Sequence, residues 1–211
     1  MTIALLANEV LKQEWLSKGV PDTVQCIWTD SVSALTMLDA DLYVDLLFHP
    51  DPERMEQLRQ MDRQPLLVNA VTQTCAGLGN HFIRINGWPT LLKRPVTEIT
   101  LPPSVSENSI QPLFEQLGWR YQLTPDIPGM ITPRILAMII NEAFYTFGDG
   151  VSSKEEIDIA MKLGTNYPMG PFEWSELLGL HRIGELLETL RLTDPRYSPA
   201  PALQQALALS H

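Results

Sequence analysis

The chain has 211 residues, of which 45% are apolar and 19% charged, and its net charge is −10. This composition is typical of a globular protein with enough residues to bury the core of one or two domains. The excess of acidic side chains repels phosphate backbones, so we expect no nucleic-acid partner. No run of 18 apolar residues and no basic-then-apolar leader occurs, so we expect no membrane partner and a cytoplasmic location.

Cysteine and histidine side chains are few and scattered. Cys26 and Cys75 lie far apart, each within an apolar run, and we interpret both as buried free thiols of a reducing compartment. The four histidines and these two cysteines show no metal-ligand spacing, so we expect no metal site.

The first half of the chain alternates short apolar runs with helical patterns. Apolar runs at 2–7, 24–28, 42–48, 65–70 and 82–86 predict strands, and helices are expected between them at 9–18, 31–39 and 51–60. A helix at about 105–117 and a strand at 121–123 follow. Strands that alternate with helices predict βαβ units and a mostly parallel sheet, an α/β fold class.

The pattern changes at residues 125–129, after which it is helical almost to the end of the chain. Helices are expected at 131–148, 153–163, 171–179, 181–191 and 201–209. The first of these is apolar around most of its circumference, so several of its sides must be covered. We therefore expect two domains, residues 1–124 with the sheet and residues 125–211 entirely α-helical.

Four segments of the helical half carry a family resemblance. Pro128-Gly129, Asn141-Glu142-Ala143, the run 157–164 (IDIAMKLG) and the run 167–173 (YPMGPFE) together resemble the C-terminal domain of 3-hydroxyacyl-CoA dehydrogenases. Because Gly170 and Pro171 also suit a chain reversal and a helix start, the same motif can be read as pure scaffold.

The resemblance continues upstream. Residues 40–45, 66–72 and 82–98 resemble strands of that family's nucleotide-binding domain, so it implies a Rossmann-like domain followed by a helical dimerisation domain. It further implies NAD as cofactor, an acyl-CoA-like ligand and a homodimer formed through the C-terminal helices. The first domain is shorter than in the family, because helical material after the second strand, which there helps to bind CoA, is absent.

The cofactor position departs from the family pattern. A dinucleotide fold needs glycines between its first strand and first helix, so that the backbone can approach the pyrophosphate. The corresponding residues 4–12 contain none, and Glu9 would repel phosphate. Asn8 and Asp30 are the candidate cofactor-binding residues, although Asp30 could equally cap the next turn, and NAD binding stays open.

The catalytic position departs as well. The family uses a histidine base that is oriented by a carboxylate. When the alignment is anchored on Trp88-Pro89, the histidine position falls on Ile85, and Glu98 falls on the carboxylate position after one inserted residue. His81 lies four residues before Ile85, about 13 Å along a strand, and would serve only if the alignment shifts.

The remaining candidates are three polar residues. Thr72 lies near the family's loop serine, Asn69 precedes it, and Arg134 matches a family arginine. We treat Thr72, with Glu98 and His81, as catalytic candidates, and Asn69 and Arg134 as substrate candidates. Pro133 stands where the family has a substrate-binding asparagine.

Three functions are compatible with these residues. The first is a dehydrogenase-like protein without the standard hydride-transfer site, a pseudoenzyme that binds an acyl-CoA-like ligand or acts as a dimeric partner. The second is an active NAD-dependent 3-hydroxyacyl-CoA oxidoreductase of fatty acid metabolism with rearranged residues. The third is a structural or interaction protein with no small-molecule site. Fold-level resemblance alone does not decide whether the chain is an enzyme.

Overall fold

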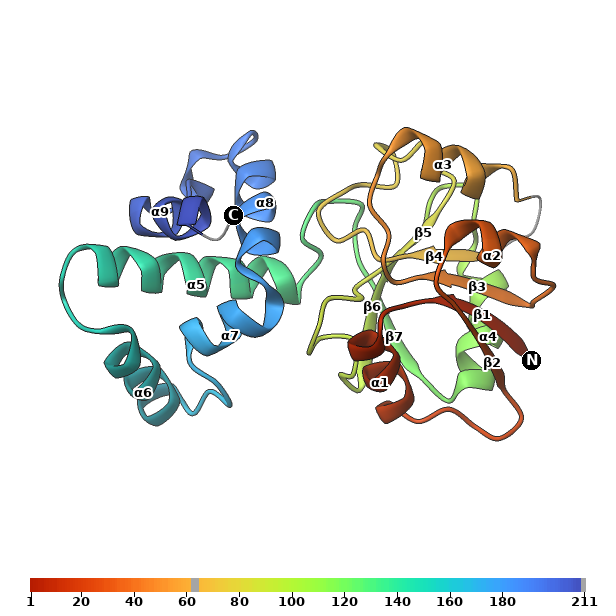
Figure 1. Ribbon diagram of the computed structural model, residues 1–211, viewed down its shortest axis with the longest axis horizontal. Helices are drawn as coiled ribbons and strands as arrows, with labels where there is room; N and C mark the ends of the chain where they lie inside the picture. Colours follow the sequence, from red (N-terminus) through yellow and green to blue (C-terminus); the bar gives the residue numbers. More distant parts are fainter. Residues whose placement is uncertain (62–64, 210–211) are drawn as a thin grey trace. The chain divides into compact units, whose positions relative to one another are not determined.

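A computed structural model describes residues 1–61 and 65–209, which divide into two compact units, Met1–Met130 and Ile131–His211 (Figure 1). The division falls a few residues after the change of pattern at 125. Asp126 and Ile127 belong to the first unit, because both accept hydrogen bonds from the side chain of Arg84. Among the described residues, no helix is both long and apolar enough to cross a membrane.

The first unit is built on a seven-stranded sheet in the order β2-β1-β3-β4-β5-β6-β7. Every neighbouring pair is parallel except β5 and β6, which are antiparallel. The mostly parallel α/β fold expected from the sequence is therefore confirmed. The strands are β1 (Thr2–Leu6), β2 (Gln25–Thr29), β3 (Leu42–Asp45), β4 (Leu66–Val68), β5 (Ile83–Ile85), β6 (Val96–Thr100) and β7 (Arg120–Leu123).

Helices cover both faces of this sheet. In β1, Ile3 and Leu5 pack on one side with helices α1 and α4, while Ala4 and Leu6 pack on the other with α2 and α3 (Figure 1). This two-sided burial explains why β1 is a continuous apolar run. The helices are α1 (Glu9–Ser17), α2 (Val32–Met37), α3 (Pro52–Arg59) and α4 (Glu107–Leu117).

The sequence did not predict strand β6. Its residues Thr97, Glu98 and Thr100 are polar, yet none is more than 7% exposed. Buried polar side chains break the apolar signal by which a strand is recognised. The antiparallel direction of this strand brings Glu98, a candidate site residue, to the edge where the parallel strands end.

The second unit is entirely helical in its described part. Helix α5 packs against α7, α8 and α9, and α6 packs against α5 and α7 (Figure 1). The long helix α5 is only partly covered within this unit, since Ile135 is 57% and Phe147 38% exposed. The elements are α5 (Thr132–Gly148), α6 (Lys154–Thr165), α7 (Pro171–Leu178), α8 (Leu180–Arg191), the 3-10 turn η1 (Pro195–Tyr197) and α9 (Pro201–Leu209).

The family motif of this unit has a structural explanation. Asp158 of α6 accepts hydrogen bonds from the backbone N–H groups of Phe172 (2.8 Å) and Glu173 (3.1 Å), so it caps the N-terminus of α7 from a neighbouring helix. Glu173 in turn accepts the N–H of Gly170 and pairs with Lys162. The motif holds two helices together and contributes no reactive group.

Lys18, the C-cap residue of α1, is half-buried in the first unit. The Lys18 ammonium donates to the Leu92 carbonyl (3.4 Å) and to the Thr97 hydroxyl, and it lies 4.5 Å from the ring centroid of Trp119. Burial lowers the pKa of Lys18 from 10.5 to about 8. The folded state therefore favours the neutral amine more strongly than the unfolded state does.

We expect replacement of Lys18 by methionine to change how stability depends on pH. Between about pH 8 and 10.5 the unfolded chain binds the Lys18 proton and the folded chain does not, so the free energy of unfolding rises with pH in this window. Relative to Lys18→Met, the wild type should gain about 1–2 kcal/mol between pH 7 and pH 10, after allowance for solvent screening. Urea unfolding at both pH values measures this, with Lys12→Met as the matched control. An equal pH response of wild type and Lys18→Met would contradict it.

Candidate functional site at the carboxyl edge of the sheet

Most of the polar candidates lie at one edge of the sheet. Parallel strands end at a common edge, which in open α/β sheets is where ligands bind. Asn8 and Asp30 follow β1 and β2, Asn69 and Thr72 follow β4, and Glu98 enters this edge on the antiparallel strand β6. The structure thus gathers five of the seven candidates on one side of the first unit.

Glu98 faces an asparagine. The backbone N–H of Asn86 donates to the Glu98 carbonyl at 2.9 Å, and the Asn86 side-chain amide donates to Glu98 Oε2 at 3.4 Å. Both side chains are buried, with 4% and 7% exposure. The side chain that faces Glu98 is thus that of Asn86, whereas the side chain of Ile85 lies in the core. An amide cannot act as a base at neutral pH, although it can donate and accept hydrogen bonds.

His81 is not brought to Glu98. It precedes β5, whose register pairs Arg84 with Thr100 in β6, so it lies at the opposite end of the strand pair from Glu98. Its ring packs edge-on against Phe82, with the two ring centroids 5.2 Å apart. The shifted alignment that would make His81 the base thus finds no support in the strand register.

Asn69 serves the scaffold. Its amide donates to the carbonyls of Leu46 (3.0 Å) and Gly87 (3.2 Å), and its Oδ1 accepts the N–H of Gly87 at 3.0 Å. A Cβ on Gly87 would lie 2.9 Å from Asn69 Cγ, so the two residues are matched to each other. With these three bonds the side chain joins the ends of β3, β4 and β5. Thr72, in the next loop, accepts a hydrogen bond from Gln73.

The start of α1 does not fit a dinucleotide pyrophosphate. The Asn8 side chain is used as the helix cap, since its Oδ1 accepts the Leu11 N–H at 3.0 Å. Glu9 adds a carboxylate in the first turn, where a phosphate would need positive potential. Asp30 is exposed after β2, and the helix that follows is capped by Ser31 rather than by Asp30. Asp30 therefore stays available to a ligand, whereas Asn8 is already engaged.

Two ion pairs of the first unit, each with a fully buried member, were not found from the sequence. Asp45, at the end of β3, is fully buried and receives two hydrogen bonds from Arg54, at 2.9 and 2.7 Å. Burial raises the pKa of Asp45, an effect that the Arg54 guanidinium opposes. Arg84 is also fully buried and pairs with Asp126 at 2.9 Å. A charged residue within an apolar strand run was the only available signal for either pair.

Both cysteines are free thiols, but the burial expected of both is confirmed for Cys75 alone and is wrong for Cys26. Cys75 is buried, and Cys26 is half-buried. Burial, together with the nearby Asp126 carboxylate, raises the pKa of Cys75 to about 12, which keeps its sulfur protonated and unreactive. Within the described part of the chain, no three His, Cys, Asp or Glu side chains are grouped so that they could hold a metal ion.

Arg134 lies in the second unit, in the first turn of α5. Its Nε donates to the Tyr197 hydroxyl at 3.0 Å, and its guanidinium carbon lies 5.0 Å from the centre of that ring. The local partner of Arg134, a substrate candidate from the sequence, is therefore an aromatic hydroxyl.

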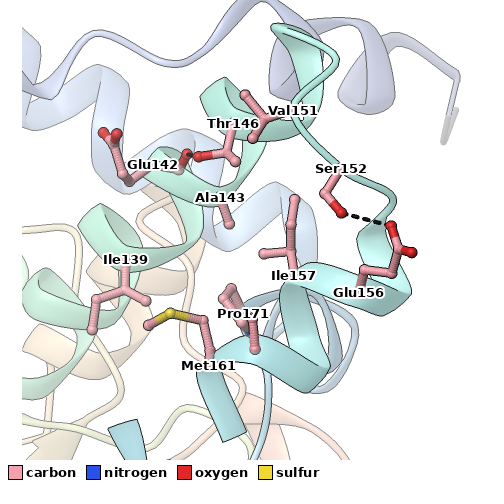
Figure 2. A pocket seen from close by; sticks show the side chains of 11 residues that line it. Ile139, Glu142, Ala143, Thr146, Val151, Ser152, Glu156, Ile157, Met161 and Pro171 are labelled. Atoms are coloured by element: carbon pink, nitrogen blue, oxygen red, sulfur yellow. Dashed lines mark hydrogen bonds between the residues drawn. The ribbon is translucent and has the colours of Figure 1, made fainter. Parts of the chain in front are cut away.

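The second unit also contains an apolar pocket of about 400 Å³ between α5, α6 and α7. Figure 2 shows Ile139, Met161, Ile157 and Pro171 around it, with the Ser152–Glu156 hydrogen bond on its rim. None of the candidate residues named from the sequence lines this pocket. Exposed apolar side chains continue along α6, where Ile159 and Leu163 are 52% and 83% exposed.

Comparison with known proteins agrees with this architecture. Residues 129–211 match the model of the 3-hydroxyacyl-CoA dehydrogenase C-terminal domain. The chain is 43% identical over 110 residues to 3-hydroxyadipyl-CoA dehydrogenase of Escherichia coli, a match that covers 51% of this chain and 23% of that protein. It is 28% identical over 211 residues to the mitochondrial hydroxyacyl-coenzyme A dehydrogenase of Sus scrofa, covering 90% of this chain and 66% of that protein.

A solved structure shows the same fold. The (S)-3-hydroxybutyryl-CoA dehydrogenase of Ralstonia eutropha superimposes with a TM-score of 0.76 at 20% identity, over 99% of this chain and 94% of that one. The chain thus spans less than two thirds of the curated relatives named above but nearly all of this solved fold. Residues 129–211 are thus similar to the 3-hydroxyacyl-CoA dehydrogenase C-terminal domain, and the chain as a whole resembles 3-hydroxyacyl-CoA dehydrogenases in sequence and in fold.

Proposed function

We propose that this protein is a cytoplasmic pseudoenzyme of the 3-hydroxyacyl-CoA dehydrogenase type, which binds an acyl-CoA-like ligand without transferring hydride. The observation that carries the proposal is the buried Asn86–Glu98 pair. The carboxylate that would orient a base is retained, but the base is replaced by an amide. Such a pair can hydrogen-bond the 3-oxo or 3-hydroxyl group of a ligand, but the Asn86 amide cannot take up the hydroxyl proton as an imidazole would.

The cofactor position supports the same conclusion. The start of α1 lacks glycine, its capping asparagine is engaged, and Glu9 repels phosphate. NAD therefore fits poorly as a resident cofactor, although Asp30 is exposed directly after β2, where a dinucleotide fold has the acidic residue for the ribose hydroxyl.

We further propose that the protein is a homodimer formed through its C-terminal helices. Helix α6 carries an exposed apolar surface. It is made of the apolar pocket of Figure 2 and of the exposed side chains of Val151, Ile159 and Leu163, which lie on or beside this helix, and its contact with water is unfavourable. Light scattering on the purified protein should give twice the chain mass. The mass of a single chain at micromolar concentration would contradict this.

The test of function combines a cofactor titration with a ligand titration. Energy transfer from the five tryptophans to NADH should show no saturable binding up to millimolar NADH. Calorimetry with acetoacetyl-CoA, a 3-oxoacyl-CoA, should show saturable binding. Asn86→Leu should weaken that binding about tenfold because a buried polar partner is lost, whereas Gln122→Leu on the exposed face of β7 should leave it unchanged.

Each alternative has its own result. NADH oxidation by the wild-type protein in the presence of acetoacetyl-CoA would establish an active oxidoreductase with rearranged residues and would overturn the proposal. Absence of binding for both NADH and acetoacetyl-CoA would favour a structural or interaction protein. Equal affinities of wild type and Asn86→Leu for acetoacetyl-CoA would move the ligand away from the Asn86–Glu98 pair.

A further inference from the structure

A second pocket lies in the helical unit and shares the lining residue Ile139 with the apolar pocket of Figure 2. It measures about 580 Å³, within the usual range for small-molecule sites. One wall is cationic and aromatic, and the other is aliphatic. The lining residues are Arg134, Ile135, Met138 and Ile139 of α5, with Arg196 and Tyr197 of η1.

Two guanidinium groups converge on one ring in this pocket. Arg134 and Arg196 both donate to the Tyr197 hydroxyl, and their guanidinium carbons lie 5.0 and 4.6 Å from the ring centroid. Arg196 has a carboxylate partner, Asp194, at 3.0 Å. Arg134 pairs with no carboxylate within the described part of the chain. Two adjacent positive charges with one counter-charge, in a protein of net charge −10, leave a local excess of positive potential.

The hydrogen bonds of Tyr197 also favour an anion in this pocket. A tyrosine hydroxyl offers two lone pairs and one proton. The two arginines use the lone pairs of Tyr197, so its O–H must donate, yet it donates to no acceptor among residues 1–61 and 65–209. Tyr197 is only 3% exposed and lines the pocket. An anion in the pocket would accept the Tyr197 proton together with the unused N–H groups of both arginines.

The apolar walls of the pocket determine which chemical group the bound anion can carry. Ile135, Met138 and Ile139 form an aliphatic strip along α5, and Ile135 is 57% exposed. Arg134 also lies in the first turn of this 17-residue helix, where the helix dipole adds positive potential. A carboxylate suits the planar fork of a guanidinium, and an attached alkyl chain would cover the aliphatic strip.

We propose that this pocket binds a carboxylate that carries an apolar chain, such as a medium-chain fatty carboxylate. The carboxylate accepts from Arg134, Arg196 and the Tyr197 hydroxyl, and the chain lies along Ile135, Met138 and Ile139. The inference is independent of the function proposed for the first unit, because every residue that it uses lies in the second.

The test is calorimetric titration of the full-length protein with sodium octanoate. Octanoate should bind saturably, while acetate, inorganic phosphate and 1-octanol should bind at least about tenfold more weakly, since each lacks either the chain or the carboxylate. Arg134→Gln and Arg196→Gln should each weaken octanoate binding at least about tenfold. Arg191→Gln, whose guanidinium pairs with Glu188 on the surface of α8, is the matched control and should leave binding unchanged.

Arg196→Gln keeps the test decisive if Arg134→Gln folds poorly, because the Arg196 side chain is 66% exposed and contributes little packing. Methyl NMR adds the location: the signals of Ile135, Met138 and Ile139 should shift with octanoate, and that of the buried Ile183 should not. If phosphate binds as tightly as octanoate, the pocket is a site for any anion. If 1-octanol binds as tightly as octanoate, the pocket is only an apolar surface. A change of molecular mass in Arg196→Gln without octanoate binding would show that a second copy fills the pocket. Each of these three results would overturn the proposal.

Discussion

Replacement of Asp126 by asparagine should lower the free energy of unfolding of the first unit by about 3 kcal/mol, because it leaves the buried Arg84 charge without its counter-charge. Arg84 is fully buried and donates to the carbonyls of Ala70, Val71 and Ile127 in addition to Asp126. Asp126 also accepts the backbone N–H groups of Cys75 (2.6 Å) and Ala76 (3.0 Å). An asparagine would turn an N–H group toward one of these donors.

The Arg84–Asp126 pair also predicts how the free energy of unfolding changes at acid pH. Burial opposes ionisation of Asp126, but the backbone donors and Arg84 outweigh it, so the pKa of Asp126 lies below its ordinary value of 3.8. The stabilisation is therefore complete above about pH 4 and is lost as pH falls through the folded-state pKa. Asp126→Asn should lack this part of the acid response.

Urea unfolding measures the effect, with fluorescence from the four tryptophans of the first unit as the signal. Glu188→Gln is the control, because it breaks an ion pair with Arg191 in which both side chains are nearly half exposed, and it should change stability by less than about 1 kcal/mol. If the Asp126→Asn and Glu188→Gln variants have equal free energies of unfolding, the Arg84–Asp126 pair contributes no more to stability than a surface ion pair does.

Replacement of Gly170 by alanine should destabilise the second unit by about 3 kcal/mol. A Cβ at this position would lie 2.2 Å from Asp158 Cγ and Oδ1, closer than atoms can approach. Asp158 would have to move, which removes its hydrogen bonds to the N–H groups of Phe172 and Glu173 at the start of α7. Fluorescence of Trp174, which lies in α7, reports the unfolding of this unit directly.

Gly164→Ala is a matched control with the opposite sign. Gly164 belongs to the same family motif, but it lies in α6 with open space around its would-be Cβ, so alanine there should stabilise the unit by about 0.5–1 kcal/mol. The double variant Asp158→Ala with Gly170→Ala should be little less stable than Asp158→Ala alone, because the collision is gone. If the losses of stability caused by Asp158→Ala and Gly170→Ala simply add in the double variant, the collision of a residue 170 Cβ with Asp158 is not the cause of the Gly170→Ala effect.

The sequence predicted the elements whose two faces are both apolar. Strands β1, β3 and β4 are buried on both sides, and their continuous apolar runs were recognised for that reason. Strand β6 was missed because a buried strand with Thr97, Glu98 and Thr100 carries no such run. The candidate site was affected by the same gap, since without strand β6 nothing in the sequence indicated that Asn86 faces Glu98.

The amino-acid sequence by itself determined the α/β unit, the helical unit and the family motif around Asp158 and Gly170, because these depend on local periodicity and on short-range turn chemistry. Only the tertiary structure decided that Asn86 faces Glu98, that His81 lies at the other end of the strands, and that Arg134 meets Arg196 on Tyr197. These juxtapositions depend on strand register and on helix packing between residues far apart in the chain, and neither leaves a pattern in the local sequence.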